Sequence, residues 1–178
     1  MDKTFKLQKA MAVIYIIAAL SLFIFSLWFL TDFNDLFGLK LKANAKVTVL
    51  HNNVLQPFNT NFFWFALVSV FSIFLVAFLE LNKKVPDLFA LIIMDLVLIA
   101  GCAASIYFFH RLGLINDVYL ALDYSGVALE GTSEYIMNNR AFVMGKTLTM
   151  GTTIVDIFYG LVLTISHIRF RKEVGNDR

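Results

Sequence analysis

The sequence predicts an all-α membrane protein built as a single domain with four transmembrane helices. The chain of 178 residues is 59% hydrophobic and only 16% charged, whereas soluble domains carry about 25% charged residues. It also contains four apolar segments near the ~20 residues that a helix needs to cross a bilayer. The predicted spans are residues 11–30, 62–81, 87–109 and 148–168.

The first apolar segment is interpreted as a permanent span. It follows a basic start with Lys3, Lys6 and Lys9, which is also typical of a secretory signal. Its apolar run is longer than the 7–15 residues of a signal core, and no small-residue cleavage site follows it. We therefore expect residues 11–30 to stay in the membrane.

The distribution of Lys and Arg predicts the orientation of the bundle. Nine of these residues flank the two termini and the turn near residue 84, while six lie in the two longer loops. The first set is Lys3, Lys6, Lys9, Lys83, Lys84, Arg169, Arg171, Lys172 and Arg178. Because cytoplasmic segments are enriched in basic residues, we expect both termini in the cytoplasm and a location in the cell membrane.

The first outer loop, residues 31–61, contains a strict alternation of apolar and polar residues between Leu39 and Val49. This period of two predicts a half-buried strand, in a hairpin or against the second loop, within a small extracytoplasmic cap. An unpaired strand edge is also a template for binding another chain. The alternative is therefore a partner surface that carries Lys40, Lys42 and Lys46.

The second outer loop, residues 110–147, has a mixed pattern. Residues 115–124 fit a short interfacial helix, and the following stretch leads into the fourth span. Neither outer loop is long enough to hold a soluble catalytic domain. We expect no cofactor and no metal site, because His, Cys and acidic residues do not occur at ligand spacing.

Two aspartates fall deep in the predicted membrane region. Asp95 lies 11 residues from Lys84, or ~16 Å along a helix, and Asp156 lies 13 residues from Arg169, or ~20 Å. The two spans run antiparallel, so the acids are expected at similar depth and able to face each other. No Lys or Arg is expected at that depth, and a charged group there costs at least ~2.5 kcal/mol.

Polar and small residues accompany both acids. The third span has the pair Gly101 and Ser105, whose spacing allows another helix to approach closely, and Gly160 is expected to do the same in the fourth. The fourth span also carries a polar stripe through most of its length. That stripe is Thr149, Thr152, Thr153, Asp156, Gly160, Thr164 and His167.

Four roles are compatible with these residues: packing and assembly, pairing with a basic residue of another subunit, an ion or proton path, and an intramembrane catalytic pair. Signal peptidase II shares the length, the four spans and the two aspartates. The sequence has IIMDLV and TIVDIF where that family needs its Asn- and Arg-containing motifs, and it also lacks the Gly-x-Gly-Asp motif of presenilin-type proteases. We therefore expect a protein that is not an enzyme.

The arrangement of spans and loops resembles claudins and other tetraspan proteins in topology only. The Gly-Leu-Trp and paired-cysteine signatures of claudins are absent, as is the Cys-Cys-Gly of tetraspanins, and topology alone does not carry function. The sequence predicts a membrane subunit that assembles with itself or with other membrane or surface proteins, and gives no reason to expect nucleic-acid binding. The alternative is a small oligomeric channel or carrier lined by Asp95, Asp156 and the span-four threonines.

Overall fold

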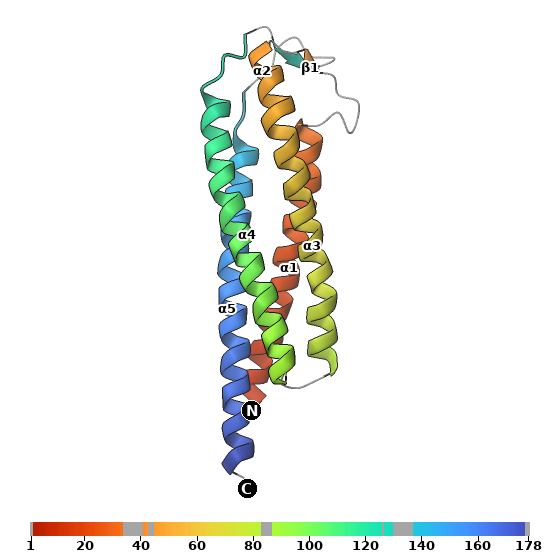
Figure 1. Ribbon diagram of the computed structural model, residues 1–178, viewed down its shortest axis with the longest axis vertical. Helices are drawn as coiled ribbons and strands as arrows, with labels where there is room; N and C mark the ends of the chain where they lie inside the picture. Colours follow the sequence, from red (N-terminus) through yellow and green to blue (C-terminus); the bar gives the residue numbers. More distant parts are fainter. Residues whose placement is uncertain are drawn as a thin grey trace.

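A computed structural model shows four long helices in one elongated bundle (Figure 1). It describes residues 2–33, 41–42, 45–82, 87–125, 127–129 and 137–176. All four long helices are apolar and long enough to cross a membrane, as predicted. Their bounds are Asp2–Phe33 (α1), Gln56–Asn82 (α3), Leu88–Leu120 (α4) and Arg140–Asn176 (α5).

Both chain termini lie at one end of the bundle, here called the termini end, and the short elements lie at the other, the cap end (Figure 1). Helix α1 packs against both α3 and α5, whereas α4 packs mainly against α5. Helices α3 and α4 touch much less. The α4–α5 contact is therefore the most extensive helix pair of the fold.

The buried residues of α1, α4 and α5 recur mostly at alternating steps of three and four. This spacing is typical of coiled-coil-like bundles, because it keeps one seam of each helix on its neighbours. On α5 the buried seam includes Thr149, Thr152, Asp156, Tyr159, Leu163 and Ser166. The opposite faces are also apolar and exposed, as at Phe74 (69% exposed) and Phe89 (74%), and a helix that is apolar all round fits a lipid surround.

The helices extend beyond the predicted spans. Helix α4 begins where the Asp87 side chain accepts a hydrogen bond from the Ala90 backbone N–H at 2.8 Å, a standard N-cap. It continues to Leu120 because Leu112, Ile115 and Tyr119 prolong its buried seam. Much of the stretch predicted as the second outer loop is thus helical, and 33 residues give a rod of ~50 Å.

The strand predicted from the alternation between Leu39 and Val49 is wrong over its second half. Ala45–Leu50 forms a short helix, α2, which runs through a π-helical turn, η2 (His51–Leu55), directly into α3. Val47 and Leu50 are both buried, three residues apart. The packing of Val47 and Leu50 on the end of the bundle outweighs the local alternation of apolar and polar residues. Such an override is common because β-propensity depends strongly on context.

Two very short strands complete the cap end. Leu41–Lys42 (β1) pairs antiparallel with Ala128–Leu129 (β2), with Leu41 opposite Leu129. The strands come from different loops, so the pairing is the predicted alternative against the second loop and not a hairpin. Lys40 and the rest of the predicted strand, residues 39, 43 and 44, lie outside the described residues.

Candidate functional site

Asp156 lies on the buried seam of α5 and is only 3% exposed. Its carboxylate rests against the backbone of α4 at Gly101, where an added Cβ atom would stand 2.9 Å from the Asp156 Oδ2. Any larger residue at that point would push the carboxylate aside. The small residue at 101 therefore gives the acid its place between the two helices.

Tyrosine and serine side chains from the other helices meet near Asp156. The hydroxyl groups of Tyr15 on α1 and Ser72 on α3 share a hydrogen bond, and the Tyr15 ring packs on Tyr159 at 5.7 Å. Tyr15 interacts electrostatically with Asp156. The Oδ1 of Asp156 has no hydrogen-bond partner within the part of the chain that the structure describes. Polar groups of α1 and α3 thus lie near the buried acid, and no basic side chain of the described residues acts on its charge.

Asp95 lies on the same α4–α5 contact but is only half-buried. Thr164 donates its hydroxyl to the Asp95 Oδ2 over a long 3.5 Å. A Cβ added at Gly160 would lie 3.7 Å from the Asp95 Oδ1. The contact is reciprocal: each helix presents an aspartate to a glycine of the other.

The two acids therefore share one helix contact, as the sequence indicated, but each faces a glycine instead of the other acid. The α5 residues beside Asp95 lie four and eight positions from Asp156, which is ~6–12 Å along the helix axis. This stagger separates a buried acid from a half-buried acid nearer the termini end.

The span-four threonines bond mostly to their own helix. Thr149 donates to the Gly145 carbonyl at 2.9 Å, Thr152 to Leu148 at 2.9 Å and Thr153 to Thr149 at 3.0 Å. Threonine commonly bonds back to the preceding turn in this way. Thr149 and Thr152 are buried and Thr153 is half-buried, so their hydroxyl protons are already committed within α5.

Small residues lie at four places along the α4–α5 contact. Gly101 and Gly160 accommodate the acids, and the hydroxyl-bearing Ser105 is fully buried on the seam of α4. The sequence missed Gly145, where an added Cβ would stand 3.0 Å from both Leu112 and Phe25. The sequence predicts a loop at this position, because the buried face of α5 starts before its strongly apolar run.

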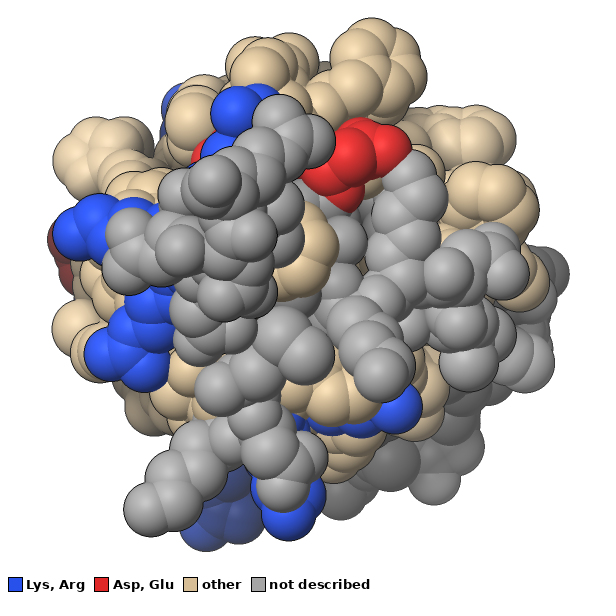
Figure 2. Space-filling view, turned by 90° about the horizontal axis from the view of Figure 1, so that it is seen from below, with Lys and Arg blue, Asp and Glu red and all other residues tan. Residues whose placement is uncertain are grey.

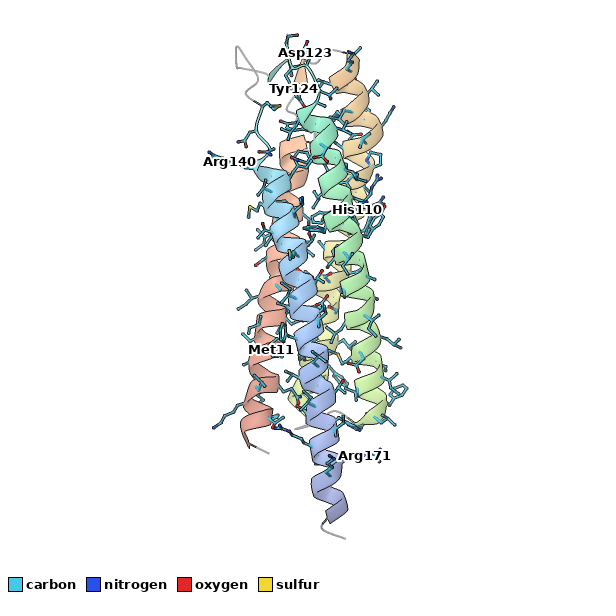
Figure 3. The ribbon with its side chains drawn as sticks, turned by 90° about the vertical axis from the view of Figure 1, so that its left-hand side faces the viewer. Met11, His110, Asp123, Tyr124, Arg140 and Arg171 are labelled. Carbon is cyan, nitrogen blue, oxygen red and sulfur yellow. The ribbon has the colours of Figure 1, made fainter. Side chains whose placement is uncertain are left out.

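The predicted partner lysines are only partly described. Lys46 is exposed on α2, whereas the side chains of Lys40 and Lys42 lie outside the described set. Lys46 interacts electrostatically with Asp123, which lies with Tyr124 at the cap end (Figure 3). Hydrogen bonds from the Ser125 backbone N–H and hydroxyl hold the pKa of the Asp123 carboxyl below its ordinary value, and Lys46 adds a smaller lowering.

His167 is half-buried on α5, near the termini end. Within the described ranges, no group of three or more His, Cys, Asp and Glu side chains is arranged to hold a metal ion. The buried Asn59 of α3 was not predicted from the sequence. Both polar atoms of its side-chain amide lack hydrogen-bond partners in the described part of the chain, and its position beside the turn into α3 hid it from the pattern of the span.

No protein-family model, curated protein or solved structure that was compared with the chain matches it.

Proposed function

We propose that the chain is a non-enzymatic integral membrane subunit that assembles with itself or with other membrane or surface proteins. In this proposal the bundle spans the cell membrane with both termini in the cytoplasm. The excess of Lys and Arg beside the termini and the turn near residue 84 supports that orientation. The four long apolar helices and their exposed apolar faces support insertion into lipid.

The observation that carries the proposal is the partial exposure of Asp95 at membrane depth. Its one hydrogen bond in the described structure is the long contact from Thr164. A carboxyl group facing hydrocarbon is costly, and such groups normally face protein or water. A partner helix that covers Asp95 removes it from lipid and offers it further hydrogen bonds.

The surface around Asp95 suits a closely packed partner. Cys102 lies seven residues after Asp95 on α4, and Thr153 lies seven residues before Gly160 on α5, so each pair shares a helix face. All of these residues and Thr164 are half-buried. We call this set the α4–α5 seam: Asp95, Cys102, Thr153, Gly160 and Thr164. Small and polar residues are the ones that membrane helices use for association.

The test is the mass of the complex extracted in a gentle detergent. Asp95→Leu removes the polar group at the seam and is expected to release the partner while the chain stays folded. The matched control is Leu96→Met, at a neighbouring residue that is 62% exposed. Equal masses for wild type and Asp95→Leu would refute assembly through the seam.

Crosslinking at Cys102, the single cysteine of the chain, identifies the kind of partner. A bifunctional maleimide is expected to join two copies if a second copy covers the seam, and Cys102→Ser abolishes that product. A heavier complex without a crosslinked dimer assigns the partner to a different protein.

The second candidate function is a small oligomeric ion or proton channel. It is favoured by the buried Asp156, whose Oδ1 lacks a partner among the described residues, and by the fully buried Ser105, whose Oγ also lacks one. The threonine hydroxyls, which bond back to α5, favour packing instead. Liposome flux decides: an ion or proton flux abolished by Asp156→Asn, with assembly intact, would establish the channel.

A further inference from the structure

Basic side chains from α1 and α5 gather at the termini end. The described exposed ones are Lys6, Lys9, Arg169, Arg171 and Lys172. We call these five residues the basic belt. Seen from this end, Lys and Arg side chains lie at several places around the face (Figure 2). Among the side chains the structure describes there, Asp87 is the exposed acid.

One hydrogen bond sets the level of this belt along the bundle. The Arg169 guanidinium donates to the Thr4 hydroxyl at 3.0 Å, which joins the start of α1 to the end of α5. At ~1.5 Å per residue, Lys6 and Lys9 lie ~3 and ~8 Å towards the cap from that level. Arg171 and Lys172 lie ~3 and ~5 Å away in the other direction. The five cations therefore fall within a slab of ~12 Å.

Exposed apolar side chains lie among these cations, at the same levels along the bundle. Leu7 is 52% exposed, Ile165 46% and Ile168 48%. The ammonium group of Lys9 lies 4.6 Å above the Phe5 ring, which holds a charge next to an apolar surface. Long basic side chains at such a border place their stems on lipid and their charges at headgroup level.

The cap end differs in its charge pattern. Lys46 interacts with Asp123 there, and Lys146 stacks over the Phe109 ring at 5.1 Å. The exposed acids Asp117 and Asp123 offset the exposed Arg140. In the described parts of the molecule, the cationic surface is therefore concentrated at the termini end, where Arg171 projects (Figure 3).

We infer that the basic belt binds the headgroups of anionic phospholipids in the leaflet at the termini end. This inference rests on the proposed membrane placement but not on assembly through the α4–α5 seam. A thin layer of cations on α1 and α5, beside exposed apolar residues, matches the lipid phosphate layer above its acyl chains. Each Lys or Arg near an anionic membrane surface favours binding about fivefold.

The test is competitive lipid retention measured by native mass spectrometry. The purified chain is incubated with equal amounts of phosphatidylglycerol and phosphatidylcholine carrying the same acyl chains. Wild type is expected to retain phosphatidylglycerol preferentially. Arg171→Gln with Lys172→Gln is expected to reduce that preference by up to about 25-fold, whereas Lys46→Gln with Arg140→Gln removes equal charge at the cap end and leaves the preference unchanged.

Equal retention of the two lipids by wild type would overturn the inference, and so would an equal loss of lipid preference in both double variants. Displacement of the retained lipid by glycerol phosphate would also overturn it, because it would indicate a site for free phosphate. The same spectra report the mass of the protein complex. Lost lipid preference in an intact complex contradicts only the lipid site, and a lipid-selective monomer contradicts only the proposed assembly.

Discussion

The two halves of the bundle are held together in different ways. Towards the cap end, Phe62 contacts the rings of Phe25, Phe58, Phe65 and Phe108 at centroid distances of 5.2–6.3 Å. Towards the termini end, the core is aliphatic and tyrosine-containing, and Asp156 and Asp95 rest on glycines. We call the first set of five rings the phenylalanine cluster.

This difference shows two ways in which a membrane bundle specifies its packing. Lipid is as apolar as the core, so helices gain from close fit and polar contact more than from escape from water. The phenylalanine cluster achieves close fit with large side chains. The aspartate region achieves it by leaving space at Gly101 and Gly160 for polar groups of the opposite helix.

Removing one ring from the phenylalanine cluster is expected to have the largest effect on stability. Phe62 is 1% exposed, and replacing a buried Phe by Ala typically costs about 3–5 kcal/mol. Phe62→Ala should lower the free energy of unfolding by about that amount in detergent micelles. Phe74→Ala, at a residue that is 69% exposed, is the control and should change it by less than about 0.5 kcal/mol. Equal effects would contradict a packed cluster.

Filling the space beside Asp156 is expected to have an intermediate effect. The Cβ of Gly101→Ala would stand 2.9 Å from the Asp156 Oδ2. Because overpacking commonly costs about 1–3 kcal/mol, the substitution should lower the free energy of unfolding by about that amount. Gly151→Ala is the control, because nothing lies within 4 Å of its Cβ position and alanine favours helix by about 1 kcal/mol.

A double-mutant cycle sharpens this prediction. In the background of Asp156→Ser, Gly101→Ala should cost less than it does in the wild type, because the colliding carboxylate is gone. Additive effects on the free energy of unfolding would show that the acid and the glycine do not meet.

The smallest effect is expected from the exposed acid at the cap end. The pKa of Asp123 is lowered by its hydrogen bonds from Ser125, so the ionised form stabilises the fold. That contribution is present above the ordinary aspartate pKa of about 3.9 and is lost as the pH falls through the lower folded value. Wild type should thus be slightly more stable than Asp123→Asn at pH 7, and the difference should vanish in acid. A constant difference across this titration would contradict the assignment.

The sequence predicted the four spans because long apolar runs have few alternative structures. It also identified Asp95 and Asp156, because an acid inside such a run is conspicuous. It did not predict their glycine contacts or the Tyr15–Ser72 hydrogen bond. Both depend on the axial offset between neighbouring helices. Long apolar segments without well-defined ends do not determine that offset.

The error in the cap has a similar physical cause. The alternation before Leu50 is a real period of two, but it is short, and the burial of Val47 and Leu50 on one helical face decides the structure. Gly145 was missed for the opposite reason. The helix around it is more polar than a typical span, yet a Cβ added at Gly145 would stand only 3.0 Å from Leu112 and Phe25.

The most direct test of the central claim is the native mass of the wild-type protein extracted in a gentle detergent. Proposed assembly through the α4–α5 seam predicts a complex heavier than the single chain of 20.2 kDa, which falls to the mass of that chain in Asp95→Leu. A wild-type protein that is a lone 20.2 kDa monomer, both in the native membrane by crosslinking and after extraction, would contradict it.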